Sequence, residues 1–186
     1  MRNIIVILLT ALLFISCKKE NLNPAFQLKK LPAETQTGAD TFGCLVNGKA
    51  FTPNNNIFSP VQNKHAHYYY DGIDQNFNVS GSRSSDKDYP VINILADFLT
   101  IEEGKTYQFK KKDKGNVYGT YEVLDNKINK YSVDRISYFT TTERGELHIT
   151  RFDQAKQVVS GTFWFDAVNE KGEVVAIRNG RFDLPL

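Results

Sequence analysis

Short apolar runs that alternate with polar residues, and are separated by turn dipeptides, fill the chain from residue 41 to its end. In the first such unit, Asn47-Gly48 separates the runs 42–46 and 49–52. Asn-Gly between apolar runs favours a tight hairpin, because both turn residues must adopt positive φ. Alternation of this kind places every second side chain on one face of a strand. The pattern therefore predicts β-strands, and no amphipathic stretch of three helical turns follows residue 41.

Further strands are expected at spacings of about 10 to 14 residues, with Gly or Asn between them. They cover residues 65–70, 77–82, 92–98, 107–109, 117–123, 131–142, 147–149, 159–165 and 175–182. About ten short strands in this arrangement predict an all-β domain over residues 41–186, built as an antiparallel sandwich or barrel.

The first sixteen residues have the layout of a signal peptide. A short polar start with Arg2 precedes twelve residues, 4–15, that carry one hydroxyl and no charge. This run is too short to span a bilayer as a helix, which needs about 20 residues. Ser16-Cys17 follows and resembles the lipobox of bacterial lipoproteins, with Phe14 where that motif usually has Leu. The resemblance implies cleavage before Cys17 and lipid attachment to its sulfur, so that the membrane is a partner through a lipid anchor.

The residues after Cys17 bear on location and on the tether. Lys18 follows the cysteine, which by analogy with lipoprotein sorting favours the outer membrane. A Lys followed by acidic residues resembles the surface-export signal of Bacteroidota lipoproteins, but Glu20 is a single acid, so the periplasmic or surface face stays open. Residues 17–40 show no strand or helix periodicity and predict a flexible tether. A short helix over residues 24–31 is the alternative.

Four segments of the folded part resemble a family of uncharacterised Bacteroidota lipoproteins, described only as a domain of unknown function. They are residues 42–51, 149–153, 159–165 and 180–183. The resemblance covers roughly residues 41–183. It implies an exported, membrane-tethered, β-rich domain, and it implies no activity or site residues.

Exposed aromatic residues are the candidate ligand-binding groups. Tyr68, Tyr69 and Tyr70 stand next to Asp71, and Trp164 is expected to point outward from its strand. Rings beside carboxylates suit sugar recognition, because CH groups pack on a ring while hydroxyls bond to polar side chains. The alternative is that these rings are ordinary core and edge aromatics.

Other residue patterns give weaker indications. His65 and His67 would share a face of one strand and could begin a metal site with His148, Asp71 or Asp74, although exposed strand residues are the preferred interpretation. We therefore expect no metal and no cofactor. With Cys17 lipidated, Cys44 has no partner and is expected to be a buried, inert thiol.

Composition and motifs limit the function classes. The net charge of +2 gives no broad basic face, so we expect no nucleic-acid partner. Catalytic motifs such as G-x-S-x-G and H-E-x-x-H are absent from the sequence. The favoured hypothesis is a non-enzymatic envelope lipoprotein that binds a glycan, a small ligand or a protein. The alternatives are a structural envelope component acting through protein contacts, and a hydrolase, which would need a deep cleft with carboxylates about 5–10 Å apart.

The anchor hypothesis predicts the behaviour of the variant Cys17→Ser. Without the sulfur that accepts lipid, the protein should stay uncleaved and leave the membrane fraction. Fractionation and intact-mass spectrometry of the native protein and the variant check this. A variant that fractionates with the membrane as the native protein does would contradict the anchor.

Overall fold

The computed structural model describes residues 21–53, 63–83, 88–125, 135–141 and 144–186. The signal segment and Cys17 lie outside the described residues. One short helix and eleven strands are present, and every pair of named strands is antiparallel. Their bounds are α1 (Pro24–Leu28), β1 (Thr41–Val46), β2 (Lys49–Phe51), β3 (Lys64–Tyr70), β4 (Gln75–Ser82), β5 (Asp88–Asp97), β6 (Thr106–Gln108), β7 (Val117–Asp125), β8 (Arg135–Phe139), β9 (Gly145–Asp153), β10 (Val158–Val168) and β11 (Val174–Pro185).

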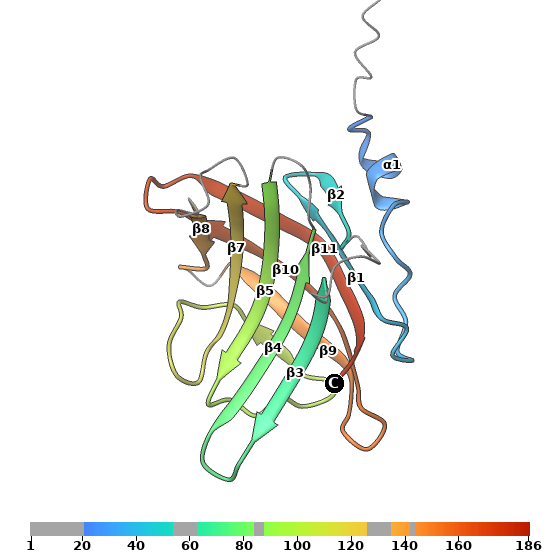
Figure 1. The fold of residues 1–186 in the computed structure, drawn as a ribbon, viewed down its shortest axis with the longest axis vertical. Helices are drawn as coiled ribbons and strands as arrows, with labels where there is room; N and C mark the ends of the chain where they lie inside the picture. The colour runs from blue at the N-terminus through green and yellow to red at the C-terminus, as the bar shows by residue number, and fades with distance from the viewer. Residues whose placement is uncertain (1–20, 54–62, 84–87, 126–134, 142–143) are drawn as a thin grey trace, which may run out of the picture.

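The strands form one open sheet that is folded into two layers (Figure 1). The order β3-β4-β5-β7-β8 makes the first layer, and β6-β9-β10-β11-β1-β2 makes the second. The sheet passes from one layer to the other at β10. One edge of β10 pairs with β9 along most of its length and with β8 only at Val168. The prediction of an antiparallel, sandwich-like β fold is confirmed. Among the described residues, no helix has the length and apolar character needed to cross a membrane.

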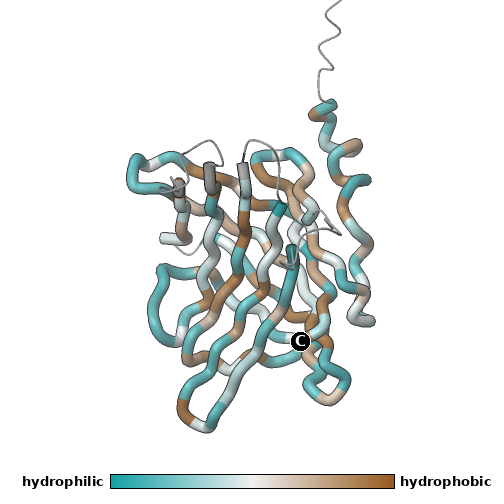
Figure 2. Tube along the Cα trace, viewed as in Figure 1, coloured by the Kyte–Doolittle hydropathy of each residue, from teal (hydrophilic) through white to brown (hydrophobic). Residues whose placement is uncertain are grey.

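The strand alternation seen in the sequence builds the core between the layers. Apolar residues recur along the strands, while the turns are mostly hydrophilic (Figure 2). Phe163 and Phe165 of β10 are buried, whereas Trp164 between them points outward, as predicted. Within the strand predicted over residues 131–142, β8 covers Arg135–Phe139, and the described residues 140 and 141 lie outside it. Residues 131–134 and 142 lie outside the described part.

Two glycines of β10 and β11 make room for phenylalanine rings on the facing strand. Gly161 is paired with Phe182, and Phe163 is paired with Gly180. A methyl group at Gly180 would lie 2.5 Å from Phe163 Cδ2, and one at Gly161 would lie 2.7 Å from Phe182 Cζ. Only a residue without Cβ fits under each ring, so the two reciprocal pairs fix how the strands are aligned.

Residues 21–40, the described part of the tether predicted over residues 17–40, are in contact with the sheet. Residues 21–40 contain α1, as in the alternative prediction of a short helix, and they lie against the second layer (Figure 1). Asn23 caps α1, accepting from Ala25 N at 3.0 Å. The fully buried Gln27 docks the helix, because its Oε1 accepts from Ala50 N of β2 at 2.9 Å. These contacts join residues distant in sequence, which local periodicity does not reveal.

The carboxylate of Asp183 on β11 holds the loop that follows α1. It is 1% exposed and accepts hydrogen bonds from the backbone N–H groups of residues 37, 38 and 39, and from the hydroxyls of Thr35, Thr37 and Ser160. Burial raises the pKa of this carboxyl, but the bonds from Thr35, Ser160 and the backbone favour the charged form and lower the pKa well below its usual range. The docked segment is thus tied to the sheet through a buried, ionised side chain.

The close packing of Gly180 under Phe163 predicts the effect of Gly180→Ala. The added methyl overpacks the core, so the free energy of unfolding should fall by about 1–3 kcal/mol in urea titrations. A double variant with Phe163→Leu should lose less than the sum of the two single changes, because the ring that the methyl meets is gone. A stability of Gly180→Ala within about 0.5 kcal/mol of the parent would contradict this packing.

The buried carboxylate predicts a pH-dependent effect of Asp183→Asn. At neutral pH the variant should lose about 2–4 kcal/mol of unfolding free energy, because several donors lose a charged acceptor. The folded-state pKa is lowered, so this contribution is full above the unfolded pKa of about 3.9 and is lost as the pH falls toward the folded value. Urea titrations from pH 7 to pH 3 should therefore show the difference from the parent shrinking in acid. Asp74→Asn in the exposed β3–β4 turn is the control and should change little at either pH. A pH-independent difference would argue against an ionised Asp183.

Candidate functional site

An irregularity in β11 shapes the outer face of the second layer. Between the pairs Phe163–Gly180 and Phe165–Ile177, β10 contributes Trp164 alone, while β11 contributes Arg178 and Asn179. This is a β-bulge, and Asn179 has the positive φ of 52° that a bulge can require. Asn tolerates this conformation better than most residues. Because of the extra residue, both Arg178 and Asn179 of β11 line the same surface groove as Trp164.

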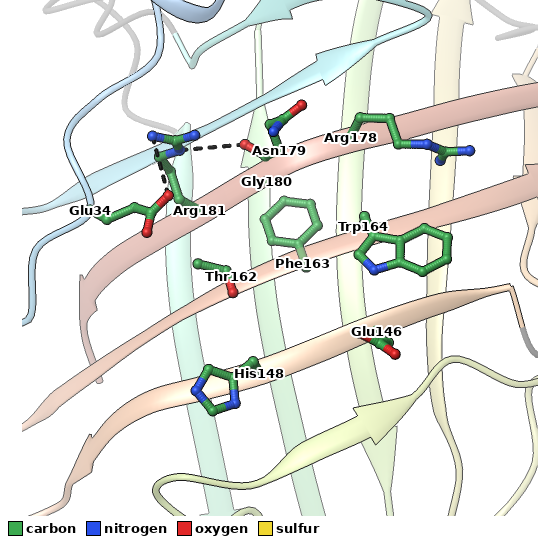
Figure 3. A pocket seen from close by; sticks show the side chains of 10 residues that line it. All are labelled: Glu34, Glu146, His148, Thr162, Phe163, Trp164, Arg178, Asn179, Gly180 and Arg181. Atoms are coloured by element: carbon green, nitrogen blue, oxygen red, sulfur yellow. Dashed lines mark hydrogen bonds and ion pairs between the residues drawn. The ribbon is translucent and has the colours of Figure 1, made fainter.

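A shallow groove of about 410 Å³ lies at this bulge and crosses three strands. It is lined by Glu146 and His148 of β9, by residues 162–164 of β10 and by residues 178–181 of β11, with Glu34 of the docked N-terminal segment at one end. Figure 3 shows the indole ring of Trp164 face-on between Arg178 and Glu146, with Thr162 and His148 farther along their strands. We call this the Trp164 groove.

The indole of Trp164 is the one large aromatic ring that reaches the groove surface among its lining residues. Trp164 is 37% exposed, and the guanidinium carbon of Arg178 lies 5.3 Å from the ring centroid. Arg178 is held in turn by Asp166, whose Oδ1 accepts from Nη2 at 2.5 Å, and by the carbonyl of Phe165 at 3.0 Å. The cation–π contact and these bonds fix the ring orientation before any ligand arrives.

Polar side chains of β9 are oriented by the edge strand β6. His148 Nδ1 shares a hydrogen bond of 3.0 Å with the hydroxyl of Thr106, and Gln108 Nε2 donates to Glu146 Oε1 at 3.0 Å. A carboxylate accepts several hydrogen bonds, so Glu146 retains acceptor capacity toward the groove. A flat ring flanked by hydroxyl, imidazole, carboxylate and guanidinium groups can hold a polar molecule that also has an apolar face.

The far end of the groove depends on the docked N-terminal segment. Arg181 donates to the carbonyl of Pro32 at 3.3 Å and forms an ion pair with Glu34 at 3.4 Å. Its side chain is only 18% exposed, whereas that of Glu34 is 59% exposed. Arg181 therefore serves mainly to position Glu34 at the groove, and the loop tied to Asp183 completes the lining.

The structure does not bring the three candidate tyrosines together with Trp164. Tyr68 is half-buried and packs edge-on against Phe152, with centroids 5.0 Å apart. Tyr69 and Tyr70 are 49% and 57% exposed, and neighbouring residues of a strand point to opposite faces. None of the three lines the Trp164 groove. They lie on β3, at an edge of the first layer, whereas Trp164 lies on the outer face of the second.

The histidines and Cys44 occupy separate environments. His65 and His67 are exposed on β3, and the pKa of His65 is lowered by partial burial and by the charge of His67. His148 lies on β9 instead. Within the described ranges, no three or more His, Cys, Asp or Glu side chains gather as metal ligands. Cys44 is a free thiol with no exposure, and burial raises its pKa, so it remains protonated and unreactive at neutral pH.

Sequence reasoning identified Trp164 but missed most of the groove around it. Arg178, Asn179 and Arg181 were not singled out, and Glu34 fell in the presumed tether. One signal was available, since Asn179-Gly180 interrupts an otherwise alternating strand and such a dipeptide suggests a bulge. The hydrolase alternative predicted a deep cleft with two facing carboxylates. The groove is shallow, and its carboxylates Glu34 and Glu146 are engaged with Arg181 and Gln108.

Comparison with known proteins gives a family but no activity. A family model described as a domain of unknown function, DUF6252, matches residues 74–183. No curated protein and no solved structure matches the chain. The matched span is more than half of the chain and includes β9, β10 and β11, so it contains the groove except for Glu34.

Proposed function

Because the chain belongs to the DUF6252 family, whose description names no activity, we propose a function from the groove itself. The domain is a non-enzymatic glycan-binding module that a lipid on Cys17 holds at a membrane. The observation that carries the binding role is the exposed, oriented ring of Trp164 in a groove lined by polar side chains.

The ring and its neighbours match the two kinds of surface on a sugar. One face of a pyranose presents CH groups that pack on an aromatic ring, while its hydroxyls need donors and acceptors at the rim. Trp164 supplies the ring. Thr162, His148 and Glu146 supply hydroxyl, imidazole and carboxylate groups beside it (Figure 3). Binding sites generally combine an apolar surface with a few placed polar groups, as this one does.

The state of the groove before binding also favours recognition of a ligand. Arg178, Glu146 and His148 each have a hydrogen-bond partner on a strand, so their positions are set by the sheet rather than by a ligand. A preorganised site avoids the ordering cost of side chains on binding. The groove is shallow and crosses three strands, which suits a unit within a longer glycan chain.

The anchor part of the proposal rests on the sequence of residues 1–20. A signal-peptide core, a Ser-Cys junction and an immediate change to charged residues are typical of a Bacteroidota-type lipoprotein. More than one acyl chain on a cysteine gives stable attachment, whereas a single chain holds only marginally. We assign the domain to the outer membrane, on either its periplasmic or its surface face.

Glycan binding predicts a specific loss in Trp164→Ala. A glycan array should first identify a ligand of the parent protein, and calorimetry should then show Kd raised about tenfold or more, corresponding to about 1.4 kcal/mol of lost stacking. Trp164→Phe should retain part of the affinity. Tyr70→Ala, whose residue is exposed but outside the groove, is the matched control and should bind as the parent does. An array without hits, or an unchanged Kd for Trp164→Ala, would rule out this function.

A further inference from the structure

The N-terminal segment exposes large apolar side chains within α1 and just before it, and Leu28 at the end of α1 is 40% exposed. Leu22 is 62% exposed and Phe26 is 44% exposed, and they are four residues apart. Gln27, next to Phe26, is buried against the sheet through its bond to Ala50 N. Gln27 thus fixes this short segment to β2, while Leu22 and Phe26 stay exposed to solvent.

Docking of residues 21–40 shortens the connection between the folded domain and Cys17. The loop held by Asp183 and the hydrogen bond that Ala50 N donates to Gln27 tie the segment to the sheet, and Gln27 Nε2 also donates to the carbonyl of Asn21. Only residues 18–20 stand between Cys17 and Asn21. Four residue steps span at most about 14 Å when fully extended. A lipid on Cys17 would therefore keep Leu22 and Phe26 close to the bilayer surface.

Basic side chains accompany the apolar pair. Lys29 and Lys30 follow α1, and Lys30 Nζ lies 4.8 Å from the ring centroid of Phe26. Apolar side chains with neighbouring lysines are the composition of segments that lie in the interface of a bilayer, where the lysines meet anionic headgroups.

We propose that Leu22 and Phe26 insert into the bilayer interface, with Lys29 and Lys30 among the headgroups, so that the anchored domain lies against the membrane in one orientation. This inference rests on the proposed anchor at Cys17, which sets the distance. The partner is a lipid surface containing anionic headgroups.

A second exposed apolar site offers an internal comparison. Ile73 in the β3–β4 turn is 85% exposed, and Tyr70 before it is 57% exposed. Figure 1 places this turn at the end of the sandwich away from α1. Apolar exposure alone would favour the β3–β4 turn, whereas the short connection to Cys17 favours α1.

The experiment places a single tryptophan at either end of the anchored protein. Phe26→Trp and Ile73→Trp are each made in a Trp164→Phe background, and the full chain purified from membranes is reconstituted into phosphatidylcholine–phosphatidylglycerol vesicles with or without brominated acyl chains. If mass spectrometry finds no acyl group on the chain, its Cys17 thiol is coupled to a maleimide headgroup lipid instead. Cys44 is fully buried and does not compete for the maleimide.

The expected result is quenching at one end only. Emission from Phe26→Trp should fall to about half or less in brominated vesicles, because interfacial segments bury their apolar side roughly 5–10 Å deep. Emission from Ile73→Trp should not change. Quenching of Ile73→Trp, equal quenching of both, or quenching of neither would overturn the orientation. A missing acyl group would overturn the natural anchor alone, and the maleimide-coupled protein would still decide the orientation.

Discussion

The docking of the N-terminal segment, and with it one end of the Trp164 groove, depends on the buried carboxylate of Asp183. A charge removed from water is costly unless it is well bonded, and Asp183 meets that need with donors from the loop at residues 35–39 and from Ser160. These bonds fix the N-terminal segment on the sheet. The segment then places Glu34 beside Arg181 at the end of the groove, and α1 is held on β2 through Gln27. The bonds of Asp183 on β11 therefore hold the loop that carries Glu34 to the groove.

The groove also requires that the bulge in β11 stay at one position. A strand that slips by one residue would move the bulge and turn every following side chain to the other face. The reciprocal pairs of Gly161 with Phe182 and Phe163 with Gly180 prevent this, because no residue with a Cβ fits under either ring. The pairs lie directly before the bulge on β10 and directly after it on β11. Core packing on the inner face thus holds Arg178 and Trp164 in place on the outer face.

The fold class followed from the sequence because alternation and turn chemistry are local signals. The Asn47-Gly48 hairpin follows from two turn residues that accept positive φ. The buried Phe163 and Phe165 and the outward Trp164 follow from the period of two along a strand. The N-terminal segment could not be predicted in this way. Gln27 and Thr35 look like tether residues until their partners Ala50 and Asp183 are known, and those partners are 23 and 148 residues away.

The candidate site was predicted only in part. Tyr68, Tyr69 and Tyr70 do not all lie on one face of β3, because consecutive strand residues point to opposite sides. Most of the groove was missed because its lining comes from three strands and a docked loop, whose adjacency is set by topology.

The Trp164 groove and α1 lie far enough apart that the proposed glycan and the proposed membrane could be bound at the same time. α1 contacts β2 at one end of the second layer, while the groove lies across β9, β10 and β11 on the outer face of that layer. A membrane at the α1 end would therefore leave the groove open toward the side rather than cover it. Glu34 marks the side of the groove that borders the docked segment. In the proposed orientation, insertion of Leu22 and Phe26 beside the anchor would restrict tilting of the domain, so the groove would face along the membrane surface at a nearly constant height. A fixed lateral site of this kind suits a ligand that is itself attached to the envelope, such as a long glycan, better than one that diffuses freely and could meet the site in any orientation.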